Sequence, residues 1–335
     1  MTHSQSTGAA LLVINRKDVA RALPMADCIA AVERAMRAYS RADANIPLRT
    51  VFALPGGRDF FGVMPGYLGD PRALGAKILT VYPENAQRGL SSHVGLVLLF
   101  DVAMGHPIAV MDAGAITAIR TAAATAVATR ALARANATNL AILGTGEQAV
   151  THLEAVSLVR QLRTVRIWGR STDKARKFAR EHASRLAVPI EVRESADSAV
   201  EGADIVCTVT AAREPILRGA ALRPGTHVNL VGSSRLGARE ADDAVVTRSR
   251  FFVDSRVSAG AEAAELRHAQ DAGLVTERHV LGEIGEVLNG NIGGRTGSDE
   301  ITVYKSLGIA PQDLAAANAI YERASRENIG TRVPF

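Results

Sequence analysis

The sequence is poor in cysteine and in aromatic residues, and each shortage argues against a class of protein. Its two cysteines, Cys28 and Cys207, are too few and too far apart for a disulfide scaffold, so we expect buried thiols in a reducing compartment. Aromatic residues make up 4% of the chain, and none interleave with a basic run. Because the formal net charge is a modest +5 and acids are scattered among the arginines, no nucleic-acid-binding surface is predicted.

Long apolar runs are missing as well. No run is long enough to cross a membrane, and the N-terminal residues MTHSQSTGAA lack the charged start and apolar core of a signal peptide. We expect residues 1–10 to form a disordered tail. These absences predict a cytoplasmic protein that binds neither membranes nor nucleic acids. A length of 335 residues with 47% hydrophobic content suffices for two domains.

The most informative stretch is a glycine turn in residues 139–149, NLAILGTGEQA. An apolar run at residues 140–143 predicts a short buried strand, and a helix-compatible segment follows the turn. Gly144 allows the tight turn, Gly146 lets the backbone approach a pyrophosphate, and the small Ala149 lets the helix pack on the strand. The helix N-terminus offers free N–H groups to phosphates. The motif also occurs as a plain structural turn, but the order of strand, glycines and helix favours a dinucleotide site.

A second predicted strand, residues 164–168, ends without a carboxylate. NAD-preferring sites place Asp or Glu about 20 residues after the glycines to bind the ribose 2′-hydroxyl. This chain instead has Arg170 and Ser171, with Lys174 one turn further along. Two cations and a hydroxyl suit a 2′-phosphate, which predicts NADP(H) as the preferred cofactor and NAD(H) as the alternative. In the competing interpretation Ser171 caps the next helix and the two cations are ordinary solvated side chains.

The first third of the chain predicts mostly antiparallel sheet with one early helix at residues 24–40. Strands are expected at 11–14, 49–54, 60–65, 76–82, 95–101 and 108–111. An alanine-rich helix at 115–135 then leads to the glycine turn. Strand and helix alternate from there, with further strands at 190–192, 205–209, 227–231 and 251–254 and a last helix at 311–327. Such alternation predicts an α/β fold with a Rossmann-type, doubly wound parallel sheet.

Several stretches in a fixed order resemble the ornithine cyclodeaminase/mu-crystallin family. The matching segments are RTVFALPGG, FFGVMPGY, GAKILTVYPEN, SSHVGLVLLFD, VMDAGAITAIRTAAATAVATR, ILGTGEQA, IWGRS, VNLVGSSRLGARE, GEIGEVLNG and ITVYKSLGIAPQD. They cover nearly the whole chain from Leu11 onward. The resemblance is greatest to the mu-crystallin-like, ketimine-reductase branch of the family.

The resemblance implies two domains and a reaction. Residues 1–121, completed by a C-terminal helix at 310–335, would form an α/β domain for substrate binding and dimerisation. Residues 122–309 would form the NAD(P)-binding Rossmann domain. The family's chemistry is hydride transfer at the α-carbon of a small amino or imino acid, and its members share a sheet in a homodimer. An open antiparallel sheet has edges and a face to cover, which also favours a dimer.

The resemblance assigns Arg49, Lys77 and Arg120 to substrate binding. These cations suit a small imino acid, because a guanidinium group can hold a carboxylate bidentately. Lys77 lies in an apolar strand run, where a buried ammonium needs a partner or a function, although alternation also permits a lysine that points to water. Lys77 can also lose a proton and thus act as an acid. Arg120 could instead lie on a solvated helix face, and Met64 is either pocket wall or core.

We expect cofactor contacts near the glycine turn and at later strand ends. These residues are Thr121, Gly144, Thr145, Gly146, Glu147, Gln148, Thr208, Val209, Val231, Gly232 and Ser233. His93 is a candidate for proton transfer or a structural histidine. Asp112 and Asp254 end predicted strands, where turn or cap roles compete with a role in the site. No metal site is predicted.

Residues 231–235 distinguish two branches of the family's chemistry. In cyclodeaminases an aspartate there binds the amine of ornithine, whereas this chain has Ser234. A neutral hydroxyl cannot pair with a second buried ammonium, although it can hydrogen-bond an imine nitrogen. We therefore predict Lys77, Arg120 and Ser234 as catalytic residues of an NAD(P)H-dependent reductase of cyclic ketimines, such as Δ1-pyrroline-2-carboxylate or Δ1-piperideine-2-carboxylate. The alternatives are ornithine cyclodeamination, alanine-type or N-alkyl amino-acid dehydrogenation, and non-catalytic ligand binding.

Overall fold

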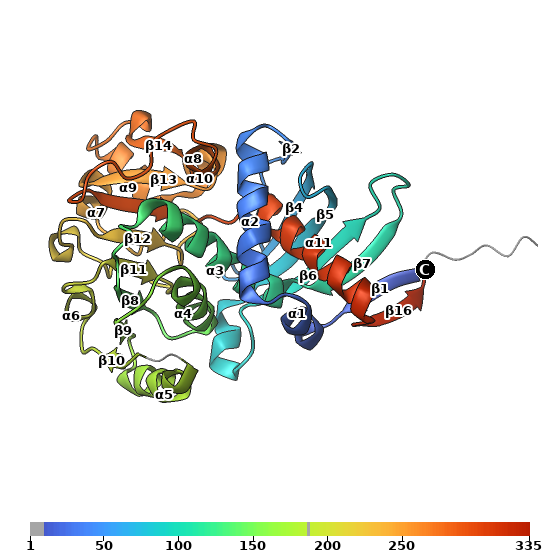
Figure 1. Ribbon diagram of the computed structural model, residues 1–335, viewed down its shortest axis with the longest axis horizontal. Coiled ribbons are helices and arrows are strands. Elements are labelled where there is room, and N and C mark those ends of the chain that lie inside the picture. Colours follow the sequence, from blue (N-terminus) through green and yellow to red (C-terminus); the bar gives the residue numbers. More distant parts are fainter. Residues whose placement is uncertain (1–9, 186–187) are drawn as a thin grey trace, which may run out of the picture. The chain divides into compact units, whose positions relative to one another are not determined.

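The computed structural model describes residues 10–185 and 188–335 (Figure 1). The predicted N-terminal tail lies outside these ranges except for Ala10. The chain forms two compact units. One comprises the residues up to Arg120 together with Ala310–Phe335, and the other comprises Thr121–Ile309. The boundary falls one residue before the predicted position, so Thr121 belongs to the second unit.

The first unit is built on one eight-stranded sheet in the order β16-β1-β7-β6-β5-β4-β2, with β3 paired to β4 (Figure 1). Its strands are β1 (Ala10–Ile14), β2 (Ala44–Asn45), β3 (Thr50–Ala53), β4 (Phe60–Leu68), β5 (Ala73–Val81), β6 (His93–Phe100), β7 (Pro107–Asp112) and β16 (Thr331–Pro334). Only the pair β1–β7 is parallel. The predicted antiparallel character is therefore confirmed, whereas β2 and β16 were not predicted.

Three helices accompany this sheet: α1 (Arg16–Ala22), α2 (Met25–Ser40) and α11 (Ala310–Glu327). The sequence did not predict α1, which begins after Asn15, whose Oδ1 accepts hydrogen bonds from Lys17 N and Asp18 N. Helix α11 packs on α2 and on β4, β5 and β6. Gly75 on β5 leaves no space for a side chain, because a Cβ there would overlap Leu98 O of β6 and would lie 3.1 Å from Leu314 Cδ2 of α11. The C-terminal helix thereby becomes part of the first unit.

The second unit contains an eight-stranded, fully parallel sheet in the order β10-β9-β8-β11-β12-β15-β13-β14. Its strands are β8 (Asn139–Leu143), β9 (Thr164–Trp168), β10 (Ile190–Val192), β11 (Ile205–Thr208), β12 (His227–Leu230), β13 (Ser249–Val253), β14 (Val280–Glu283) and β15 (Ile301–Lys305). The predicted doubly wound sheet is confirmed, although β14 and β15 were not predicted. The strand order reverses between β8 and β11, and ligands of such folds bind at the carboxyl ends of the strands beside this reversal.

Helices alternate with these strands. They are α3 (Ala113–Leu132), in which the boundary between the units falls, α4 (Glu147–Val159), α5 (Thr172–His182), α6 (Ala196–Val200), α7 (Asp243–Thr247), α8 (Arg256–Glu262), α9 (Ala264–Asp271) and α10 (Ile284–Leu288). Buried aliphatic side chains of the strands and helices form apolar clusters around the sheet. None of the helices in the described ranges is both long and apolar enough to cross a membrane.

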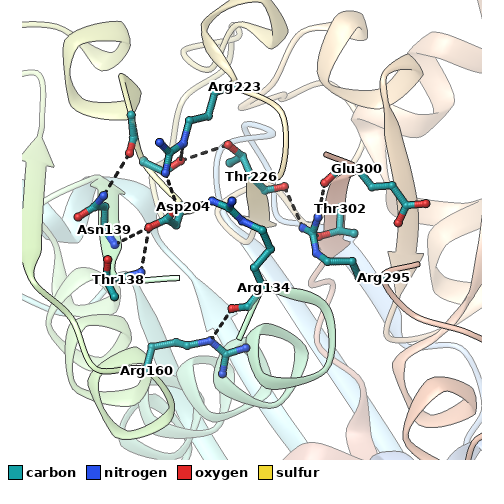
Figure 2. Close-up of polar contacts among 12 residues, drawn as sticks. Arg134, Thr138, Asn139, Arg160, Asp204, Arg223, Thr226, Arg295, Glu300 and Thr302 are labelled. Atoms are coloured by element: carbon teal, nitrogen blue, oxygen red, sulfur yellow. Dashed lines mark hydrogen bonds and ion pairs between the residues drawn. The ribbon is translucent and has the colours of Figure 1, made fainter. Parts of the chain in front are cut away.

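A network of charged side chains lies at the amino-terminal ends of the parallel strands (Figure 2). Asp204, directly before β11, accepts hydrogen bonds from Thr138 N (2.9 Å) and Asn139 N (3.0 Å) at the start of β8. Arg134 Nη2 donates to the same carboxylate at 2.5 Å, and Arg223 donates to it as well. Since Asp204 is 5% exposed, these partners compensate a nearly buried charge. The network joins two neighbouring strands at the edge opposite the one where ligands of this fold bind.

Candidate active site

Lys77 lies on the buried face of β5 in the first unit. Burial alternates along this strand, and Lys77 shares the buried side with Ala73 and Gly75. Its side chain is 3% exposed, so the interpretation of a lysine that points to water is wrong. The ammonium is paired, because Lys77 Nζ donates to Asp313 Oδ1 at 2.9 Å and to Oδ2 at 2.8 Å. Met64 lies directly opposite Lys77 in the register of β4 and is 5% exposed.

Arg120, on α3, joins the same carboxylate. Its Nε donates to Asp313 Oδ1 at 3.0 Å, and its Nη1 donates to Gln312 Oε1 at 2.8 Å. Arg120 is 5% exposed, so the solvated helix face is also wrong for this residue. Gln312 and Asp313 belong to the first turn of α11 and were missed as site residues. The only signal in the sequence was the segment PQD at the end of a family-like stretch.

The cluster of Lys77, Arg120 and Asp313 is electrostatically unbalanced toward positive charge. Burial lowers the pKa of Lys77 to about 8, and the attraction of Asp313 opposes this effect. The charges of Arg120 and Arg49 lower the pKa of Lys77 further, which places Arg49 within electrostatic reach of the lysine. Arg49 itself is half-buried and directly precedes β3. Lys77 and Arg120 therefore share one carboxylate, and Arg49 lies within electrostatic reach of Lys77.

In the second unit, the glycine turn lies at the carboxyl end of β8, beside the reversal of strand order. Gly144 has φ +127°, and a Cβ there would lie 2.7 Å from Val209 O, so only glycine fits. Gly144 N donates to Trp168 O at 2.8 Å. A Cβ at Gly146 would meet nothing within 4 Å, and this residue begins α4 without a side-chain cap. Ala149 is fully buried. The turn thus has the open cradle that a pyrophosphate needs at a helix N-terminus.

The end of β9 lies beside this turn. A Cβ at Gly169 would lie 2.8 Å from Thr145 Cγ2, so the two loops are in close contact. Ser171 Oγ accepts a hydrogen bond from Lys174 N at 3.3 Å, which confirms the cap of α5. The side chain of Arg170, directly before the cap residue, and that of Lys174, in the first turn of this helix, are exposed. They are accessible to a phosphate, and their role as its ligands stays a prediction.

The loops after β11 and β12 carry the other predicted cofactor residues. Val209 and Val231 are each 8% exposed, and Gly232 is exposed. Two predicted contact residues turn their hydroxyl groups toward protein atoms: Thr208 Oγ1 donates to Glu240 Oε2 at 2.6 Å, and Ser233 Oγ donates to a backbone carbonyl. Their backbone rather than their side chains would therefore face a ligand. Ser234 is half-buried, and its catalytic role stays a prediction.

The remaining predicted residues differ in how far they are exposed, and one of them caps a helix. Thr121 is 8% exposed on α3, while Glu147 is exposed and Gln148 half-buried in the first turn of α4. Asp112 Oδ1 accepts a hydrogen bond from Ala115 N at 2.7 Å, which is the predicted cap role.

Asp254 and His93 also have hydrogen-bond partners within the protein. Asp254 Oδ2 accepts hydrogen bonds from Leu307 N and Gly308 N, and the exposed His93 has its Nδ1 3.0 Å from Ser92 Oγ. In the described ranges, no group of three or more His, Cys, Asp or Glu side chains could hold a metal ion.

The chain is similar to several characterised proteins. The ketimine reductase mu-crystallin of Mus musculus is 40% identical over 276 residues, which cover 82% of this chain and 84% of the relative. The structure of Δ1-pyrroline-2-carboxylate reductase from Thermococcus litoralis, in complex with NADH and L-proline, has a TM-score of 0.94 at 37% identity and covers 96% of this chain and 100% of its own. An archaeal alanine dehydrogenase dimer with bound NAD has a TM-score of 0.92 at 30% identity, over 97% of this chain and 99% of its own.

A family model covers both of the regions described above. The family model described as "Ornithine cyclodeaminase/mu-crystallin family" matches residues 10–328, which is nearly the whole chain. The matched range includes the glycine turn and the cluster of Lys77, Arg120 and Asp313. The chain therefore belongs to the ornithine cyclodeaminase/mu-crystallin family.

Proposed function

We propose that this chain is an NAD(P)H-dependent reductase that converts cyclic ketimines, such as Δ1-pyrroline-2-carboxylate and Δ1-piperideine-2-carboxylate, into cyclic amino acids. The observation that carries this proposal is the buried Lys77–Asp313–Arg120 cluster with Arg49 nearby. A similar reductase solved with NADH and L-proline, and a similar ketimine reductase, support the same reaction.

The cations would bind the substrate carboxylate. Arg49, Lys77 and Arg120 carry three positive charges, and Asp313 compensates one of them, so the cluster favours an anionic ligand. Gln312 holds Arg120 by its Oε1, while its buried Nε2 has no hydrogen-bond partner in the described part of the chain. An unsatisfied buried donor costs about 1–3 kcal/mol. A carboxylate oxygen that accepts from Gln312 Nε2 would offset this cost.

Lys77 would supply the proton of the reaction. When bound, the reduced nicotinamide provides a hydride for the imine carbon. The imine nitrogen must then gain or retain a proton to become the amine, and Lys77 Nζ can donate one because its pKa of about 8 lies close to neutral pH. Asp313 holds this ammonium at 2.8–2.9 Å and thereby fixes where the proton is delivered.

The glycine turn would hold the dinucleotide. Gly146 leaves the turn open to a pyrophosphate, and Gly144 allows the tight turn beside Val209, which supports an NAD(P) site. We further propose that NADP(H) is preferred, because Arg170 and Lys174 stand exposed where NAD-preferring sites have a carboxylate. The two similar structures contain NADH and NAD, so this preference rests on the residues of this chain.

A single panel of assays tests the reaction. NADPH and NADH consumption would be followed with the two cyclic ketimines, with Δ1-pyrroline lacking the carboxylate, and with pyruvate plus ammonia. Ammonia release from ornithine would be measured in parallel. We expect turnover of the carboxylated ketimines and negligible turnover of the other substrates. Faster turnover of pyruvate would indicate an alanine dehydrogenase, and ammonia release from ornithine at a comparable rate would indicate a cyclodeaminase.

We also propose that the chain forms a homodimer. Apolar side chains are exposed on and beside β3 and at the start of β6, including Leu48 (47%), Val51 (50%), Phe52 (53%) and Val94 (52%). Exposed apolar groups on one sheet are typical of an interface. A similar alanine dehydrogenase is described as a dimer. Light scattering of the purified protein should therefore give twice the chain mass of 35.3 kDa, and a monomer at micromolar concentration would contradict this proposal.

A further inference from the structure

A buried glutamate lies at the carboxyl edge of the parallel sheet and has no role in the chemistry proposed above. Glu240 is 0% exposed, and its two oxygens accept four hydrogen bonds. Oε1 accepts from Thr210 N and Thr210 Oγ1, both at 2.7 Å. Oε2 accepts from Thr208 Oγ1 and from Gly232 N, both at 2.6 Å. The carboxylate therefore joins the loop after β11 to the loop after β12.

Two more buried charged residues, Glu265 and Lys305, lie next to Glu240 in the same hydrogen-bond network. Glu265 Oε1, on α9, accepts a hydrogen bond from Glu240 N at 3.0 Å. Lys305 Nζ, at the end of β15, lies 2.8 Å from Glu265 Oε2 and donates to Ser233 O. Glu265 and Lys305 are at most 1% exposed. The network thus fixes the backbone of Ser233 as well as that of Gly232.

Four hydrogen-bond donors surround the two carboxylate oxygens of Glu240. Every acceptor position on its two oxygens faces a donor, and two of these donors are the backbone N–H groups of Thr210 and Gly232. Burial raises the pKa of this carboxyl group, whereas the hydrogen bonds from Thr208 and Thr210 and the charge of Lys305 act in the opposite direction. A buried carboxylate with full hydrogen bonding holds its neighbours in one geometry, because any displacement leaves a charge unpaired.

The loop after β11 also lies close to the glycine turn. A Cβ at Gly144 would lie 2.7 Å from Val209 O, and a Cβ at Gly232 would lie 2.5 Å from Glu240 Oε1. The loop is thus confined between the turn proposed to hold the pyrophosphate and the glutamate. Glu240 binds Thr210, the neighbour of Val209 in the chain, so the glutamate and the glycine turn contact adjacent residues of one loop.

We infer that Glu240 is a positioning residue for the dinucleotide, which fixes the loops after β11 and β12 in the geometry that binds the cofactor. This inference rests on the proposed function, because it concerns the site at which the dinucleotide is proposed to bind. Glu240 does not contact the ligand itself in this view. It acts through the backbone of Val209, Gly232 and Ser233.

The test is Glu240→Gln, which keeps the size of the side chain. In either orientation the new amide nitrogen faces a backbone N–H, of Thr210 or of Gly232, that cannot turn away. Binding is measured by quenching of Trp168, the only tryptophan, whose carbonyl accepts from Gly144 N. We expect the Kd and the KM for NADPH to rise about tenfold, the effect of one lost buried hydrogen bond. The KM for the ketimine should change much less.

The matched control is Asp204→Asn at the opposite edge of the same sheet. Asp204 is also buried and also accepts two backbone N–H groups, so its loss should lower the thermal stability but leave the NADPH Kd unchanged. If Glu240→Gln does not fold, Thr210→Val and Thr210→Ser replace it. Valine removes the Oγ1 donor and should weaken NADPH binding severalfold, whereas serine retains the donor and the affinity.

The outcomes separate this inference from the proposed function. Equal NADPH affinity in wild type and Glu240→Gln, or in Thr210→Val and Thr210→Ser, would overturn the positioning role. An equal loss of affinity in Asp204→Asn would show a general effect of stability and would also overturn it. Because quenching needs no turnover, a wild type that binds NADPH but reduces no ketimine would refute only the reaction. A wild type that binds neither dinucleotide would refute both.

Discussion

Asp313 Oδ1 and Oδ2 lie 2.9 and 2.8 Å from Lys77 Nζ, although the two residues are 236 positions apart in the chain. The C-terminal helix α11 supplies the carboxylate, and the strand β5 supplies the ammonium. Asp313 is 1% exposed, so neither charge has water as an alternative partner. The reactive lysine of the proposed mechanism is therefore held in place by the last helix of the chain.

Replacement of Asp313 by asparagine should lower both stability and activity. The change leaves Lys77 and Arg120 without their buried counter-charge, which costs about 3–5 kcal/mol when a buried pair is broken. It also removes the attraction that raises the pKa of Lys77, so the ammonium should lose its proton at lower pH. Chemical unfolding and the pH profile of ketimine reduction measure the two effects.

The control for this variant is Asp313→Glu, which keeps the charge. It should retain the position of the alkaline limb in the pH profile even if the rate falls. An Asp313→Asn enzyme whose alkaline limb coincides with that of the wild type would contradict the pairing proposed to control Lys77.

The pH profile of the wild type is a separate prediction. Reduction needs the protonated lysine, and burial lowers the pKa of Lys77 to about 8. As pH rises through 8, the protonated fraction decreases, so kcat/KM for the ketimine should fall about tenfold per pH unit above that value. Oxidation of the cyclic amino acid needs the neutral amine and should rise over the same range. A profile of Lys77→Arg with an unchanged alkaline limb would show that another group titrates.

Arg170→Ala tests the preference for NADP(H). A charge-assisted hydrogen bond to the 2′-phosphate is worth about 1.5–3 kcal/mol, so NADPH affinity should fall roughly ten- to hundredfold. The affinity for NADH should change little, because NADH lacks this phosphate. Arg180→Ala is the control, since Arg180 is an exposed arginine in the last turn of α5, the helix that follows Arg170. Equal losses for both cofactors in Arg170→Ala would show that this arginine does not bind the phosphate.

Local motifs could be predicted from the sequence, and long-range pairings could not. The glycine turn was found because Gly144, Gly146 and Ala149 lie within one strand–turn–helix segment whose spacing has a direct physical reason. Lys77 remained ambiguous, because alternation in a strand permits either face until the partner Asp313 is known. The strand β15 was missed: its lysine at position 305 resembles a solvated residue, yet it is fully buried beside Glu265.

The stability of the second unit should fall in mild acid because two of its buried histidines resist protonation. His152 lies between Gln148 O (2.7 Å from Nδ1) and Thr125 Oγ1 (3.0 Å from Nε2), and burial lowers its pKa from 6.5 to about 4. Burial and the charge of Arg295 lower the pKa of His227 to about 3. Both histidines are therefore neutral in the folded chain at pH values where an unfolded chain already binds protons.

The sign and the size of this effect follow from proton linkage. Above pH 6.5 neither state is protonated and the full stability is present; as pH falls from 6.5 toward 4, only the unfolded state takes up the protons. Each histidine then reduces the free energy of unfolding by about 1.4 kcal/mol per pH unit. Urea unfolding between pH 7.5 and pH 4.5 should show that His227→Gln loses less stability on acidification than the wild type. The control His106→Gln, in which an exposed histidine is replaced, should lose as much stability as the wild type. Parallel pH dependence of the wild type and His227→Gln would show that carboxylates alone account for the loss of stability in acid.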